Sequence, residues 1–185
     1  MNVPNILTLF RISLIPIFVL VFYLPFKWSY EGSAIVFGIA ALTDWLDGYL
    51  ARKLKQISPL GEFLDPVADK LIVAVALVLL VQAYASVLLA IPAAIIVCRE
   101  IVISALREWM AEVGKRRTVA VSLMGKLKTA IQMVSIFVLL SQNPKIHSWI
   151  TILGFVLIYL AAFLTLWSML VYLRAARDDL LIESI

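Results

Sequence analysis

Charged residues are scarce in this sequence. Asp, Glu, Lys and Arg make up 15% of its 185 residues, whereas soluble domains carry about a quarter. Cysteine and histidine occur once each, as Cys98 and His147. This excludes an intrachain disulfide, and it excludes a metal site built from His and Cys ligands within one chain. The low charge also excludes an ordinary soluble domain and a disordered chain.

Apolar residues dominate instead, at 63% of the chain with a mean hydropathy of +1.02. A membrane-spanning helix takes about 20 apolar residues, so a chain of this length supplies at most about half a dozen spans. Little sequence remains for a soluble domain, and any active site must be built from the helices and their ends. We therefore predict an all-α, polytopic integral membrane protein, with one domain over residues 1–185.

The apolar runs predict six transmembrane helices joined by short loops. Pro66 and Pro92 are expected at helix starts, where the missing N–H costs little. The stretch KLKQISPLGEFLDP is expected to be a polar connection. The predicted spans are residues 6–26, 33–52, 66–87 (or from nearer Gly61), 92–113, 120–140 and 149–173.

Basic residues in the loops are distributed unequally between the two sides that six spans define. Lys27 and Lys145 fall on one side. The other side holds Arg52, Lys53, Lys55, Lys115, Arg116, Arg117, Arg174 and Arg177. Because cytoplasmic loops carry the excess of Lys and Arg, both termini and the connection between spans two and three are expected in the cytoplasm.

Two pairs of aspartates flank that connection. Asp44 and Asp47 are three residues apart, and Asp65 and Asp69 are four apart, so each pair shares a helix face. Antiparallel packing would bring the four carboxylates together, and ionisable residues in spans are usually functional. Hard oxygen ligands favour Mg²⁺ or Mn²⁺, with room for two ions. The alternative is a set of helix caps and surface charges at the interface.

Two glycines accompany the aspartates. Gly48 follows Asp47 directly, and Gly61 precedes Asp65 by four residues. Glycine allows a bulky ligand to approach the backbone closely. Together with two metal ions and Arg52, these glycines indicate a diphosphate ligand.

The whole stretch fits the pattern D-x-x-D-G-x-x-A-R, eight residues, then G-x-x-x-D-x-x-x-D. The matching residues are Asp44, Asp47, Gly48, Ala51, Arg52, Gly61, Asp65 and Asp69. The chain therefore resembles the CDP-alcohol phosphotransferase family. The segments PNILTLFRI, LDPVADK, REIVISALREWMAE, GKLKTAIQM and LTLWSM are similar to its bacterial members that use sn-glycerol 3-phosphate, so the resemblance spans essentially the whole chain.

The resemblance implies an activity and a setting. Such members transfer the phosphatidyl group of CDP-diacylglycerol to sn-glycerol 3-phosphate, which yields phosphatidylglycerophosphate and CMP. They share a six-helix fold, commonly form homodimers, and open their active site to the cytoplasm. Mg²⁺ or Mn²⁺ and the bacterial inner membrane follow as expectations. No nucleic-acid partner is expected either, because a nucleic-acid patch would need a soluble face that this composition does not supply.

The resemblance also implies roles for individual residues. Asp44, Asp47, Asp65 and Asp69 would hold the metals, and Asp69 would also take the proton of the acceptor hydroxyl. The pocket for the CDP group of CDP-diacylglycerol would be lined by Gly48, Arg52 and Gly61.

The first helix offers further candidates. Asn5, Thr8 and Arg11 would reach the nucleotide if they act as in the family. The equal alternative is that they anchor an interfacial helix to lipid headgroups.

The acceptor is an anion, so its phosphate needs Arg or Lys. Arg99, Arg107 and Lys126 are the candidates. Arg107 on span four and Lys126 on span five lie at suitable depths, whereas Arg99 lies deeper. Arg99 could instead pair with Glu100 as a structural ion pair. Lys128 is expected to snorkel toward the membrane surface.

Two other functions remain open at this point. The same chemistry could use another acceptor, such as inositol phosphate, phosphatidylglycerol or serine. A divalent-cation transporter could also use an aspartate cluster. Transporters often have internal repeats and broken helices at the bilayer midplane, whereas these acids lie at one membrane edge without a repeat, which disfavours transport.

Overall fold

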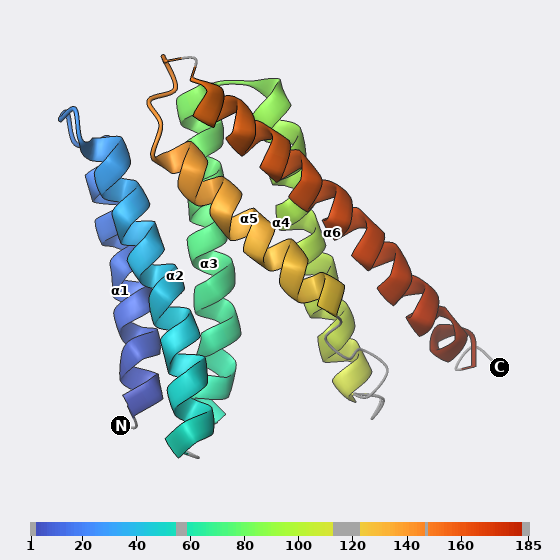
Figure 1. Cartoon of the computed structure of the whole chain (residues 1–185). Coiled ribbons are helices and arrows are strands. Elements are labelled where there is room, and N and C mark those ends of the chain that lie inside the picture. The colour runs from blue at the N-terminus through green and yellow to red at the C-terminus, as the bar shows by residue number, and fades with distance from the viewer. Residues whose placement is uncertain (1–2, 55–58, 113–122, 147, 183–185) are drawn as a thin grey trace.

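A computed structural model shows an all-helical chain, described over residues 3–54, 59–112, 123–146 and 148–182. Within these ranges, the six helices are α1 (Val3–Tyr23), α2 (Ser29–Leu54), α3 (Pro59–Tyr84), α4 (Val87–Glu112), α5 (Leu123–Leu140) and α6 (Trp149–Ile182). Successive helices run in opposite directions, and the two termini lie at the same end of the bundle (Figure 1).

The helices present large apolar side chains to the outside. Leu20, Val78 and Phe163 are each more than 60% exposed, a pattern that suits contact with lipid rather than water. In the described residues, three stretches are long and apolar enough to cross a membrane, Asn5–Tyr23, Val87–Met110 and Trp149–Leu173. A shorter apolar helix covers Leu127–Leu140. The predicted all-α, polytopic membrane fold is confirmed.

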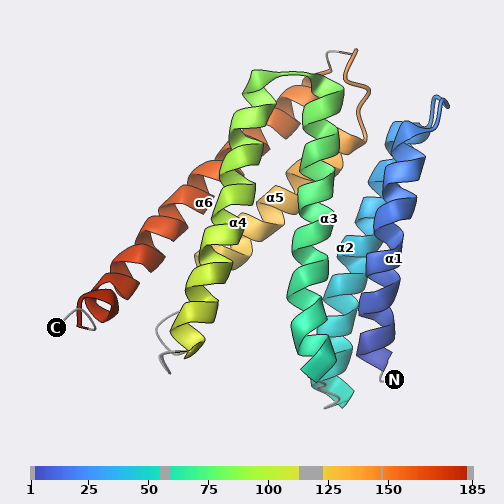
Figure 2. The ribbon, with the colours of Figure 1, turned by 180° about the vertical axis from the view of Figure 1, so that it is seen from behind.

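Helix α3 occupies the middle of the bundle, in contact with α1, α2, α4 and α5. Helix α6 packs on α4 and α5, and α3 and α4 run side by side in the reverse view (Figure 2). The core is formed by buried side chains such as Leu77 of α3, and by the rings of Phe18 and Phe37, whose centroids are 6.2 Å apart.

Helices α5 and α6 approach closely at Gly154. The Ser135 hydroxyl donates to the Gly154 carbonyl oxygen at 2.9 Å. A Cβ atom at Gly154 would lie 2.7 Å from Cδ2 of Leu139, so the approach depends on the missing side chain.

The structure corrects the predicted helix starts. Helix α3 begins at Pro59, so most of the expected connection is helical and Pro66 lies inside the helix. Helix α4 begins at Val87, with Pro92 inside it. Each proline removes one backbone hydrogen bond, a loss that neighbouring helices and local adjustments accommodate in membrane proteins. Helix α6 continues beyond the predicted span to Ile182.

Candidate active site

A buried arginine joins the first three helices. Arg11 of α1 has a fully buried side chain. Its Nη1 lies 2.9 Å from Oδ1 of Asp44 on α2 and also donates to Oδ1 of Asp69 on α3. Two carboxylates this close repel each other unless a cation lies between them. The structure thus brings together aspartates from both halves of the motif, and Arg11 supplies the compensating charge.

Helix α1 presents a polar face to α3. Asn5, Thr8 and Arg11 are spaced by three residues, share one helix face, and are all buried. The Thr8 hydroxyl donates to Oδ1 of Asp65, and Gly61 is buried near the start of α3. The side chains of Asn5, Thr8 and Arg11 are therefore packed inside the bundle and do not reach lipid headgroups. The alternative, in which they anchor an interfacial helix to headgroups, is wrong.

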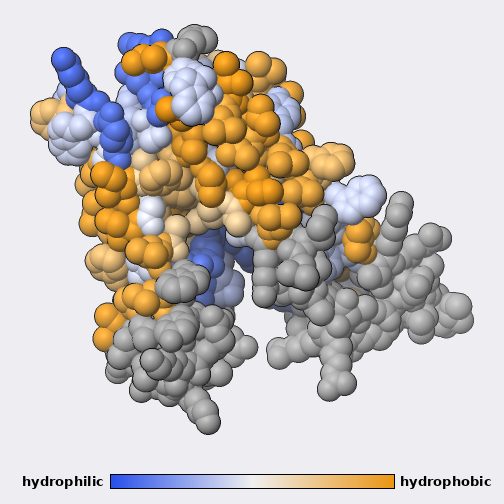
Figure 3. All heavy atoms as spheres, viewed as in Figure 1, coloured by the Kyte–Doolittle hydropathy of each residue, from blue (hydrophilic) through white to orange (hydrophobic). Residues whose placement is uncertain are grey.

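A cleft of about 650 Å³ adjoins these residues. The side chains of Asp44 and Asp69 line it and are 44% and 46% exposed. The other polar residues in its lining are Arg11, Lys70, Glu100, Thr129 and Gln132. Figure 3 shows hydrophilic side chains in a hollow on the lower half of the face, below a mostly apolar upper half. The cleft therefore combines carboxylates and cations next to an apolar exterior.

An ion-pair network joins α4 and α5 beside the cleft, which Glu100 lines. Nη1 of Arg99 lies 2.8 Å from Oε1 of Glu100, and Nζ of Lys128 lies 3.1 Å from the same oxygen. Nη2 of Arg99 also donates to the Ser168 hydroxyl at 3.5 Å. Arg99 therefore forms the structural ion pair with Glu100 that was the alternative to binding of the acceptor phosphate. Lys128 is 2% exposed, so the expectation that it snorkels is wrong: its charge is neutralised by Glu100 instead.

Several predicted site residues are helical, but their side chains fall outside the part of the structure that is described. They are Asp47, Gly48 and Arg52 on α2, Arg107 on α4 and Lys126 on α5. Among the described residues, no three His, Cys, Asp or Glu side chains form a metal-binding group. The four-aspartate metal site therefore stays a prediction.

Sequence reasoning missed Lys70. This residue follows Asp69, lines the cleft, and donates from Nζ to the Ser104 hydroxyl on α4. The available signal was its place directly after the last aspartate of the motif.

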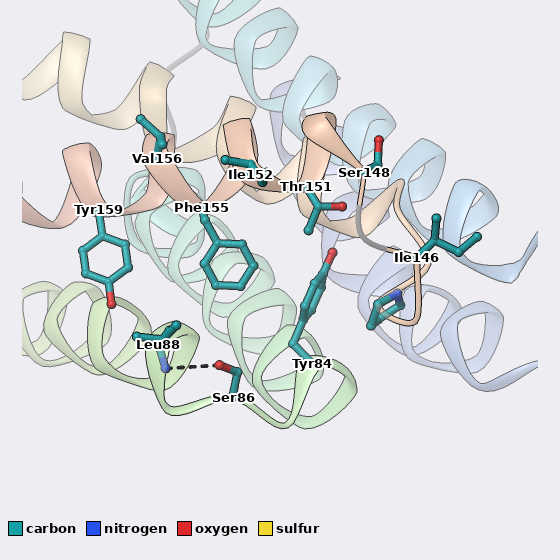
Figure 4. Close-up of a pocket in the computed structure, with 11 residues that line it drawn as sticks. Tyr84, Ser86, Leu88, Ile146, Ser148, Thr151, Ile152, Phe155, Val156 and Tyr159 are labelled. Carbon is teal, nitrogen blue, oxygen red and sulfur yellow. Dashed lines mark hydrogen bonds between the residues drawn. The ribbon is translucent and has the colours of Figure 1, made fainter.

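A larger cavity of about 740 Å³ lies at the opposite end of the bundle, between α6 and the connection from α3 to α4. Tyr84, Thr151 and Phe155 lie together in it, and the Ser86 hydroxyl accepts from the Leu88 amide at 3.3 Å (Figure 4). None of the described residues that line it carries a charge. This described lining therefore does not offer the groups that phosphate chemistry requires.

The family model for CDP-alcohol phosphatidyltransferase matches residues 1–167, so the chain belongs to this family. The chain is also similar to individual bacterial members named CDP-diacylglycerol–glycerol-3-phosphate 3-phosphatidyltransferase. The protein from Salmonella paratyphi A is 58% identical over 97% of both chains. The protein from Shigella flexneri serotype 5b is 57% identical over 97% of both chains. The protein from Pseudomonas fluorescens is 56% identical over 97% of this chain and 92% of its own.

Proposed function

We propose that the chain transfers the phosphatidyl group of CDP-diacylglycerol to sn-glycerol 3-phosphate, with release of CMP. The observation that carries this proposal is the identity of 56–58% to relatives named for that reaction, over 97% of the chain. The acid-lined cleft supports it independently, because it places carboxylates and cations beside an apolar exterior. Both a lipid and a water-soluble anion need such a site.

The chemistry of the residues fits a divalent cation. Asp44 and Asp69 reach the cleft from α2 and α3, and Asp65 adds a third carboxylate on α3. Carboxylate oxygens are the ligands that Mg²⁺ and Mn²⁺ prefer. We propose that these residues and Asp47 hold one or two such ions. When bound, the ions neutralise the diphosphate and stabilise the departing CMP.

The resemblance to the family assigns the proton transfer to Asp69, and the position of this residue in the cleft is compatible with that role. Its carboxylate is nearly half exposed to the cleft, while Arg11 fixes one of its oxygens. In the proposed reaction, Asp69 takes the proton of the acceptor hydroxyl as that oxygen attacks the phosphorus that carries diacylglycerol. The new bond joins the acceptor oxygen to this phosphorus. The bond that breaks links the phosphorus to the oxygen of CMP, which leaves as an anion. Arg11 is a positioning residue in this scheme.

The setting belongs to the same proposal. The cleft lies in the half of the bundle that holds both chain termini, and the basic loops predict that this end faces the cytoplasm. CDP-diacylglycerol would enter from the bilayer and the acceptor from the cytoplasm of a bacterium. A homodimer in the inner membrane is expected from the resemblance to the family.

The test is CMP release by purified protein in detergent. CDP-diacylglycerol is supplied with Mg²⁺ or Mn²⁺, and the acceptors compared are glycerol 3-phosphate, inositol phosphate, serine and none. Release that requires glycerol 3-phosphate and stops with EDTA supports the acceptor and the metal together. Release with a different acceptor would refute the acceptor assignment. Folded protein that releases no CMP with any acceptor would refute the enzyme proposal.

A further inference from the structure

Lys70 lies where two cavities meet. It lines the cleft that holds Asp44 and Asp69, and it lines a groove of about 440 Å³ between α3 and α4. The groove walls are mostly apolar, with Ile96, Val97 and Ile101 among them, and the carboxylates of Glu100 and Glu108 also line it. The side chain of Lys70 thus lies between the acid-lined cleft and a mostly apolar groove.

Among the described residues that line the cleft, the charged side chains form ion pairs with one exception. Arg11 binds Asp44 and Asp69, and Glu100 binds cations of α4 and α5. In the part of the chain that the structure describes, the recorded partner of Lys70 is the neutral Ser104 hydroxyl, and no carboxylate forms an ion pair with it. A half-buried cation held by a neutral hydroxyl keeps its charge available for an anion.

The position of Lys70 in the chain identifies which anion fits. Lys70 and Asp69 are neighbours, and their Cα atoms are about 3.8 Å apart. Both side chains line the cleft. A short acceptor with a hydroxyl at one end and a phosphate at the other can therefore place its hydroxyl at Asp69 and its phosphate at Lys70.

We propose that Lys70 binds the phosphate of the acceptor, and that the Ser104 hydroxyl holds the Lys70 ammonium in position for it. Ser104 precedes Arg107 by three residues on α4, a spacing that puts both positions on one helix face. In this proposal, Lys70 makes the enzyme selective for a phosphomonoester acceptor over an uncharged alcohol. This inference rests on the proposed phosphatidyl transfer and adds a specificity determinant to it.

The test compares Lys70→Gln with the wild type in the CMP-release assay. Loss of a charged hydrogen bond to the phosphate should raise KM for glycerol 3-phosphate by about tenfold to a hundredfold. KM for CDP-diacylglycerol should stay within about twofold, and Lys70→Arg should recover part of the loss because it keeps the charge. Lys145→Gln is the matched control, since Lys145 is an exposed lysine in the connection between α5 and α6, and this connection lies at the end of the bundle opposite the termini (Figure 1). It should leave both KM values unchanged.

A second readout separates binding from structural support. The preference for glycerol 3-phosphate over glycerol, as a ratio of kcat/KM values, should fall in Lys70→Gln and fall less in Ser104→Ala. If Lys70 only ties α3 to α4, the two variants will lose activity equally with both acceptors, and the inference is wrong. If only the KM for CDP-diacylglycerol rises, Lys70 binds the donor diphosphate, and the inference that it binds the acceptor phosphate is also wrong.

The same experiment distinguishes failure of the inference from failure of the proposed function. If the wild type releases CMP with glycerol 3-phosphate while Lys70→Gln keeps its KM and its preference, only the role of Lys70 is refuted. If the wild type releases no CMP with glycerol 3-phosphate, the acceptor assignment and the role of Lys70 are refuted together. If Lys70→Gln does not fold, the inference is tested with Lys70→Arg and Ser104→Ala instead. An unchanged KM for glycerol 3-phosphate in both variants would count against it.

Discussion

Replacement of Arg11 by methionine would remove the cation between Asp44 and Asp69. Loss of one partner from a buried ion pair costs about 3–5 kcal/mol. Here the two carboxylates are 44% and 46% exposed, so water screens much of their repulsion, and exposed pairs contribute at most about 1 kcal/mol. We therefore expect Arg11→Met to lower the free energy of unfolding by about 2 kcal/mol. For a chain of this size, that corresponds to a fall in Tm of about 4–8 °C.

The assay is thermal unfolding in detergent, followed by circular dichroism in EDTA. Arg11→Lys should recover part of the loss, because lysine keeps the charge but lacks the forked geometry of arginine. Lys145→Met, in the exposed connection between α5 and α6, serves as the control and should shift Tm by no more than about 2 °C. A Tm of Arg11→Met that matches the control would refute the argument that this arginine compensates the two carboxylates.

Three further substitutions test other contacts. Asp69→Asn should reduce kcat by at least about a hundredfold without loss of folding, because an amide cannot accept the proton; near-normal CMP release would exclude Asp69 as the base. Thr8→Val should lower stability by about 1 kcal/mol through the lost hydrogen bond to Asp65, measured as a Tm shift of about 2–4 °C; an unchanged Tm would contradict that contact. Glu100→Gln removes the carboxylate that pairs with Arg99 and Lys128 and should cost about 3 kcal/mol in denaturant unfolding. Stability equal to the wild type would show that this carboxylate does not stabilise the two cations.

The sequence predicted the helices well because the apolar runs are long and the charges fall between them. It failed at Pro66 and Pro92. Residues 59–65 include a proline, a glycine and two acids, which is typical of a connection in water. At the end of a helical bundle, tertiary contacts stabilise the same residues as a helix, and the prolines fall inside α3 and α4.

The spacing predicted that aspartates of the two motif halves lie close together, as Asp44 and Asp69 do, but it did not predict their counter-charge. Arg11 lies 33 residues before Asp44 in sequence, and only the packing of α1 against α2 and α3 brings them together. Lys128 was misjudged for the same reason. Its partner, Glu100, is on another helix, and helical spacing gives no information about contacts between helices.

Helix α3 combines two kinds of residue in one continuous element. Its first twelve residues include Asp65, Asp69 and Lys70, whereas Ile72, Ala76, Leu77, Leu79 and Leu80 enter the buried core. The effect of substitution should therefore change along the axis of this helix as well as between its faces. In a scan of all positions, variants before residue 71 would mainly lose turnover while remaining in the membrane. Variants of the buried positions after it would mainly lose abundance.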